Sequence, residues 1–187
     1  MSRSVEIMME EHRYIERMLK VVRAICTKIM SGADIDYSDF EEVMDFVRKY
    51  ADEHHHGKEE KFLFKEMQEH LGKIGENLVT HGMLVEHDYG RLYMLELRAA
   101  LERVKAGDEE SKLDVIANAI SYTHLLERHI AKEDEIVYTY GAKYLPQEVI
   151  YEVDRLTEEF EEKTKEAGIQ MKYIDLLKRL ENKYICQ

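Results

Sequence analysis

The sequence contains the stretch HHHGKEE at residues 54–60, and a second segment, HIAKE at residues 129–133, repeats part of its pattern. In both segments a histidine stands four residues before a glutamate; the pairs are His55 with Glu59 and His129 with Glu133. Residues at this spacing lie one turn apart on the same face of an α-helix. An imidazole and a carboxylate placed in this way can hold one metal ion. The two pairs therefore indicate a metal site inside a helical bundle, with two ions as the leading interpretation.

The composition favours helices. The chain has 187 residues, with one proline, Pro146, and nine glycines. Charged residues make up 35% and hydrophobic residues 44% of the chain. Few helix-breaking residues and many Glu, Lys, Leu and Met residues are typical of an all-α fold, and the length fits one domain.

The charge and the apolar segments exclude several classes of partner. The net charge of −12 argues against nucleic acid and against an anionic membrane surface, since phosphate binding requires a basic face. No apolar run approaches the roughly 20 residues that cross a bilayer. The acidic, amphipathic N-terminus does not fit a signal peptide. Cys26 and Cys186 form no CxxC motif, so a reduced, cytoplasmic setting is expected.

Apolar residues at steps of three and four predict four long helices, over residues 4–30, 38–71, 76–106 and 109–140. A capping box, Ser38-Asp39-Phe40-Glu41, is expected to open the second of them. Glycines are expected to end the first three; they are Gly32, Gly72 and Gly107.

The last part of the chain contains two further predicted helices, one between Pro146 and Gly168 and one around residues 174–184. It contains no histidine. We therefore expect an up-down four-helix bundle with the metal site in residues 1–143. Residues 144–187 are expected to form a helical extension that packs on the bundle or mediates self-association, as in a homodimer.

Each of the four long helices places ionisable side chains on its apolar face: His12, then His55 with Glu59, then His87, then His129 with Glu133. A buried charge is costly unless it is paired or binds a metal. A single buried histidine is more often satisfied by a backbone carbonyl or a tyrosine, so a helical scaffold without a functional metal is the simplest alternative. The coincidence across four helices favours a shared metal site instead.

The remaining histidines need separate treatment. Helical periodicity leaves His56 undecided as a ligand, and four others fall off the inward lines: His54, His70, His81 and His124. We expect His70 to be solvated and His124 to lie beside the site or on the surface. The tyrosines are interpreted as packing residues, except that one or two near the site could donate a hydrogen bond to a bound oxygen species.

The ligand types narrow the choice of metal. Imidazole and carboxylate without a thiolate cluster suit iron, manganese or zinc. The sequence has no recognisable Ser or Cys nucleophile, no glycine-rich phosphate loop and no HExxH motif. Ferritin-like carboxylate bundles carry Glu-x-x-His on two helices, and only Glu53 with His56 fits that pattern here.

The chain resembles the hemerythrin-like, or HHE cation-binding, family. The resemblance rests on Glu11-His12, HHGKEEKFLF at residues 55–64, MLVEHDYGR at residues 83–91 and HIAKED at residues 129–134. It implies a four-helix bundle that holds two non-haem iron ions, with zinc and manganese ranked behind iron. In such a centre Glu59 and Glu133 would bridge the irons, and His56 would be an extra ligand, as in some members. The terminal ligands would be His12, His55, His87 and His129.

Two departures separate the chain from the oxygen-carrying hemerythrins. Those proteins have His-x-x-x-His in the third helix, whereas Met83 and Arg91 stand four residues either side of His87 here. Their fourth helix has an aspartate five residues after the histidine, whereas Glu133 follows His129 by four. The chain is more similar to bacterial and archaeal HHE proteins linked to iron handling, nitric-oxide or peroxide stress and iron–sulfur cluster repair.

The resemblance implies a protein that binds or reduces a small oxidant, namely O2, peroxide or nitric oxide, in iron, oxidative or nitrosative stress. A peroxidase-like or catalase-like enzyme and an NO-related oxidoreductase are the enzymatic alternatives. A metal- or oxygen-sensing module without turnover is the non-enzymatic alternative. The sequence leaves this choice open.

Overall fold

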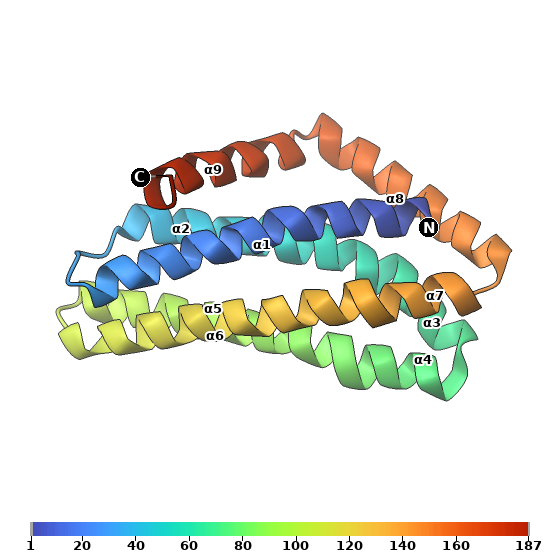
Figure 1. Cartoon of the computed structure of the whole chain (residues 1–187), viewed down its shortest axis with the longest axis horizontal. Helices are drawn as coiled ribbons and strands as arrows, with labels where there is room; N and C mark the ends of the chain where they lie inside the picture. The colour runs from blue at the N-terminus through green and yellow to red at the C-terminus, as the bar shows by residue number, and fades with distance from the viewer. Residues whose placement is uncertain (1, 187) are drawn as a thin grey trace.

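The computed structural model describes residues 2–186, and these residues fold into helices with no strand among them. Four long helical runs lie side by side and alternate in direction, as an up-down bundle (Figure 1). Two more helices follow and cover one side of the bundle (Figure 1). The predicted all-α bundle with additional C-terminal helices is therefore confirmed.

The four runs have the following bounds. The first is α1 (Arg3–Met30). The second comprises α2 (Tyr37–Phe46), the π-helical segments η1 (Val47–His56) and η2 (Glu59–Leu63), and α3 (Phe64–His70). The third comprises α4 (Gly72–Leu78), the π-helical turn η3 (Val79–Met83) and α5 (Leu84–Lys105). The fourth comprises a short 3-10 turn, η4 (Glu109–Ser111), then α6 (Lys112–Lys132), the π-helical turn η5 (Glu133–Val137) and α7 (Tyr138–Tyr144).

The start of the second run differs from the sequence prediction. Asp36, rather than Ser38, caps α2, because its carboxylate accepts a hydrogen bond from the Asp39 N–H at 3.2 Å. The other half of the expected capping box, Glu41, turns away and pairs with Arg98 of α5 at 3.3 Å. An aspartate caps a helix as well as a serine does, so α2 begins at Tyr37.

The predicted end of the first run is confirmed, since Gly32 follows α1 with a φ of 94° that residues with a Cβ atom avoid.

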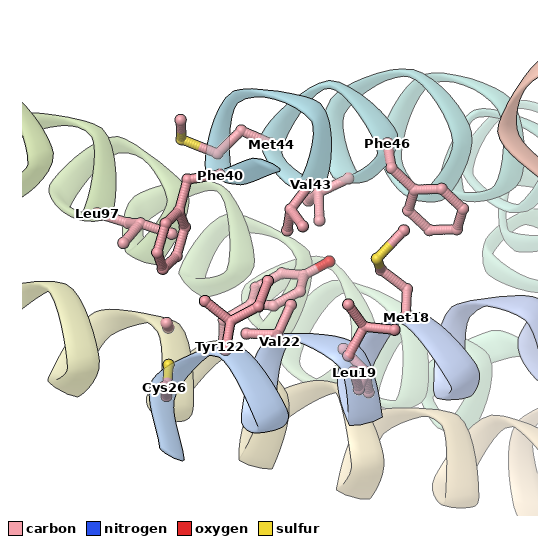
Figure 2. Close-up of a cluster of buried hydrophobic side chains, with 14 of the residues drawn as sticks. Met18, Leu19, Val22, Cys26, Phe40, Val43, Met44, Phe46, Leu97 and Tyr122 are labelled. Atoms are coloured by element: carbon pink, nitrogen blue, oxygen red, sulfur yellow. The ribbon is translucent and has the colours of Figure 1, made fainter. Parts of the chain in front are cut away.

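One apolar cluster fills the end of the bundle near the α1–α2 connection. In Figure 2, Leu19 and Val22 of α1 face Phe40 and Val43 of α2, and Leu97 of α5 packs beside them. All these side chains are buried, and they recur at steps of three or four along each helix. Their burial supplies the main stabilisation of this half of the bundle, at about 1.5–3 kcal/mol per large side chain.

A second apolar cluster fills the opposite end, and it also takes side chains from all four runs. Its members include Met8 of α1, Phe64 of α3, Met83 of η3 and Val137 of η5. On every run, the residues between the two clusters are the polar ones that the sequence singled out. A polar layer therefore crosses the bundle between two apolar ends.

The extension consists of α8 (Gln147–Glu166) and α9 (Ile169–Tyr184), which lie along α1 and α2 (Figure 1). The α9 residues Tyr173, Leu177 and Leu180 are buried in the first apolar cluster. At the other end, Asp154 of α8 accepts a hydrogen bond from the Ser4 N–H at 2.8 Å. Within residues 2–186, no helix combines the length and the apolar character that crossing a bilayer requires.

Candidate metal centre

All seven residues predicted as metal ligands lie together in the polar layer. Each is between 0% and 5% exposed. They come from all four runs, and they are His12, His55, His56, Glu59, His87, His129 and Glu133. Burying this many ionisable groups is unfavourable without compensating charge.

Four of the seven residues stand on π-helical segments. His55 and His56 lie in η1, Glu59 begins η2 and Glu133 begins η5. A π-helix has more residues per turn than an α-helix, and such segments occur often at functional sites. The angle between successive side chains is therefore smaller, so the neighbours His55 and His56 both face inward. This geometry settles the position of His56, which α-helical periodicity left undecided.

The inward atoms form two adjacent groups. His12, His55, Glu59 and Glu133 each offer one ligand atom within 4.8 Å of the others, and so do His56, His87 and His129. The two glutamates face both groups. Glu133 lies 3.3 Å from Nε2 of His12 through one oxygen and 3.1 Å from Nε2 of His129 through the other.

Glu59 has the same relation to the two groups. One of its oxygens lies 3.7 Å from Nε2 of His55, and the other lies 3.7 Å from Nε2 of His87. Each carboxylate thus has one oxygen directed at either side of the layer.

Every inward imidazole has a carboxylate at its Nδ1 atom. The pairs are His12 with Asp134 (2.7 Å), His55 with Glu11 (2.8 Å), His56 with Asp52 (3.3 Å), His87 with Glu60 (2.7 Å) and His129 with Glu86 (2.9 Å). An ionised carboxylate can only accept, so Nδ1 carries the hydrogen and the lone pair of the neutral ring lies on Nε2. Metal-binding histidines are usually oriented in this way.

Cations surround these outer carboxylates in turn. Asp134 pairs with Arg13, Glu11 with Lys58, and Glu86 with Lys132. Arg91 pairs with both Asp52 (2.7 Å) and Glu60 (2.8 Å). Arg91, four residues after His87, therefore contacts the carboxylates of two inward histidines. It stands outside the inner layer.

Several inner atoms make no hydrogen bond. Among the described residues they are Nε2 of His55 and of His56, one oxygen of Glu59 and both oxygens of Glu133. Buried polar atoms without partners are rare, because each costs about 1–3 kcal/mol. Five of the seven unpaired buried atoms in residues 2–186 are lone-pair donors of this layer, the other two being Nδ1 of His54 and Oε1 of Gln170, so the residues present fit a bound metal cation.

Two rings have the protonation state that this fit requires, whereas two others do not. Burial and the charge of nearby His12 lower the pKa of His55 to about 4, and burial also lowers that of His56. Both rings are thus neutral at pH 7, the form that binds metals. Burial lowers the pKa of His12 and of His129, but Asp134 and Glu133 raise that of His12 overall, and Glu133 and Glu86 raise that of His129 to about 9. Burial and the neighbouring Glu133 raise the pKa of Glu59 well above its ordinary value. A nearby cation would relieve the repulsion between these two carboxylates.

Sequence reasoning missed three features around the layer. Tyr138 is buried, donates a hydrogen bond to Glu59 and lies 3.4 Å from Nε2 of His12. Tyr138 stands five residues after Glu133, a spacing that α-helical periodicity does not place on the same face. The π-helical turn η5 between them brings both side chains inward. His54 is buried as well, although its Nε2 faces Glu11 and Lys58 instead of the inner layer. Lys58 is fully buried.

The outlying histidines lie where the sequence placed them. His124 is exposed and contacts Arg23 at 3.3 Å, and His70 is exposed near Glu66. His81 is also exposed. None of the three belongs to the polar layer.

The chain matches the family described as Hemerythrin HHE cation binding domain over residues 3–140. No curated protein and no solved structure gives a match. The matched residues span the four runs of the bundle and include all seven residues of the inner layer. The chain, whose inward histidines and glutamates fit a metal site, therefore belongs to the hemerythrin HHE cation-binding family.

Proposed function

We propose that the chain is a non-haem di-iron protein that binds or reduces a small oxidant, namely O2, peroxide or nitric oxide, in the handling of iron, oxidative or nitrosative stress. The proposed ligands are the five histidines and two glutamates of the inner layer: His12, His55, His56, Glu59, His87, His129 and Glu133. Imidazole and carboxylate suit iron, and zinc and manganese rank behind it.

The observation that carries the proposal is the placement of the two glutamates. Glu59 and Glu133 each direct one oxygen at the two-histidine group and the other oxygen at the three-histidine group. A single ion would not need both oxygens of both carboxylates. This arrangement favours two metal ions over one.

The donor set leaves room for a small molecule. Seven side chains offer fewer ligand atoms than two octahedral ions accept, and the deficit is greater beside His12 and His55. Two ferrous ions would supply two electrons to an oxidant bound there. The two apolar clusters close the layer toward both ends of the bundle. Arg13, Lys58, Arg91 and Lys132 hold the outer carboxylates that fix the imidazoles.

Tyr138 is the proposed hydrogen-bond donor to the bound oxidant: its single O–H donates to Glu59 in this structure and would turn to the oxidant once Glu59 binds metal. Its hydroxyl lies beside the two-histidine group. Burial and Glu59 raise the pKa of Tyr138 well above its ordinary value, so it stays a phenol that can donate.

The change Tyr138→Phe is expected to leave the iron content unchanged and to slow the reaction with oxidant at least tenfold, since loss of one positioned hydrogen-bond donor costs about 10²–10³-fold. It also leaves a Glu59 oxygen unpaired, so metal-free protein should lose about 1–3 kcal/mol of stability. Stopped-flow absorbance and thermal unfolding measure the two effects. Tyr140→Phe, two residues further along, is the control. Equal rates in both variants would remove Tyr138 from this role.

The test of the function begins with metal content, measured by elemental mass spectrometry on protein expressed in iron-supplemented medium without chelators. Two irons per chain are expected. The anaerobically reduced protein is then mixed with O2, peroxide or nitric oxide, and its absorbance is followed. Spectral change with at least one of them is expected. Absence of any change with all three would refute the oxidant chemistry, and one zinc per chain would refute the di-iron centre.

A metal- or oxygen-sensing module without turnover is the second candidate. The observation that favours it is the contact between the buried Lys58 and Glu161 of α8, which links the surroundings of His55 to the extension. Metal binding would then change how α8 and α9 pack or associate, as in a homodimer. A metal-dependent change in mass by light scattering, with no consumption of oxidant, would favour this candidate.

A further inference from the structure

A cavity opens on the side of the bundle between the second and third runs. Its volume is about 330 Å³. Its wall is formed by η1 and α5, with Tyr122 of α6 behind them, and its inner end reaches His56 and His87. These two rings stack at a centroid distance of 3.8 Å. The cavity thus leads from the surface to the three-histidine side of the inner layer.

The cavity is too large for a diatomic molecule or peroxide alone. One water molecule occupies about 30 Å³ of liquid, and O2 or nitric oxide is of similar size. The cavity volume of about 330 Å³ is about ten times larger. It falls within the range of pockets that hold organic ligands, about 300–1,000 Å³.

Most of the wall is apolar. The apolar side chains are Met44, Val47, Met94 and Leu95. Gly90 carries no side chain, and a Cβ atom there would lie 3.6 Å from the Tyr122 ring. The absence of that atom adds space against the ring. The wall is therefore suited to the apolar part of a ligand, such as an alkyl chain or an apolar ring.

Arginines gather at the rim of the cavity, although the whole chain carries a net charge of −12, and nearby carboxylates pair with each of them. Three arginines line it, Arg48, Arg91 and Arg98, against one carboxylate, Asp52. Arg91 is held by Asp52 and Glu60. A guanidinium group binds carboxylates through paired N–H donors.

Arg48 and Arg98 are held only weakly. Arg48 contacts Glu53 and Arg98 contacts Glu41, each at 3.3 Å. Their side chains are 70% and 53% exposed, and exposed ion pairs contribute little. An incoming anion can therefore compete for both guanidinium groups.

We propose that this cavity binds an organic anion with an apolar body, of the size of a medium-chain carboxylate. The carboxylate lies at Arg48 and Arg98, and the alkyl body lies between η1 and α5 above His56 and His87. The inference rests on the proposed function only in placing this ligand next to a metal centre. Binding itself needs the cavity and the arginines alone.

The test is calorimetric titration with octanoate, on the protein as purified and again after chelation of its metal. Saturable binding is expected in both forms. Octanol should bind at least tenfold more weakly than octanoate because it lacks the charge, and acetate should not bind because it lacks the alkyl body. The chelated form separates this inference from the oxidant chemistry, since binding there does not depend on iron.

Variants locate the site. Arg48→Gln with Arg98→Gln is expected to weaken octanoate binding at least tenfold and to leave octanol unchanged. Arg155→Gln is the control, because Arg155 is 52% exposed and paired on α8. Leu95→Glu, at an exposed position on the rim, should also weaken binding, whereas the equally exposed Leu113→Glu should not. No heat with octanoate in either form, or binding unaffected by the arginine and Leu95 changes, would overturn the proposal.

Discussion

Protein with both His55→Ala and His129→Ala is expected to bind no metal. One of these histidines belongs to each group of the inner layer, so the double change removes a ligand from both halves of the proposed centre. Metal that binds only the folded state stabilises it by about 4 kcal/mol at a concentration a thousand times its Kd. The double variant should lose that gain entirely, and its melting temperature should no longer respond to ferrous iron.

The matched control is His70→Ala with His124→Ala, which removes two exposed histidines outside the layer. Elemental mass spectrometry and anaerobic thermal unfolding with and without ferrous iron apply to both proteins. The control should keep the wild-type metal content and the metal-dependent rise in melting temperature. Retention of two metals per chain by the inner double variant would disprove the ligand assignment.

Lys58→Met is expected to cause a large loss of stability, although Lys58 lies outside the inner layer. The Lys58 ammonium is fully buried, pairs with Glu11 and Glu161 and lies 3.1 Å from Nε2 of His54. Burial alone would raise the pKa of Glu11. The charge of Lys58 and hydrogen bonds from His54 and His55 hold this pKa well below its ordinary value. Removal of the cation leaves a buried, ionised carboxylate, which costs about 3–5 kcal/mol. The melting temperature should fall by about 10 °C.

A double-mutant cycle separates charge from packing in this cluster. Lys58→Met combined with Glu11→Gln should recover part of the loss, because the variant no longer buries an unpaired charge. Lys61→Met, at an exposed position three residues along, should leave the melting temperature within about 2 °C of the wild type. If Lys58→Met melts like the control, the buried ion pairs do not stabilise the fold.

The sequence predicted which ionisable side chains lie together in the inner layer, for a physical reason. Each helix buries one face, and an ionisable residue on that face is expensive enough that its position carries information. His12, His87 and the two His–Glu pairs therefore stand out against apolar neighbours. The structure brings all of them, with His56, into one layer.

The rest could not be predicted because it depends on departures from α-helical geometry or on contacts between distant segments. The π-helical η1 turns His55 and His56 inward together, and η5 precedes Tyr138. Glu161 meets Lys58 across more than a hundred residues of sequence. Neither helical periodicity nor a local sequence motif can predict a contact between such distant residues.

The two apolar clusters on either side of the polar layer each join all four runs of the bundle. Each cluster holds the four runs together at its own end, so the helices are packed on both sides of the donors. The donors are then open to replacement during evolution without loss of the scaffold. Because the apolar clusters hold the scaffold and the central residues hold the ligand atoms, changes at a few central positions would let the same fold bind different ions and different small molecules.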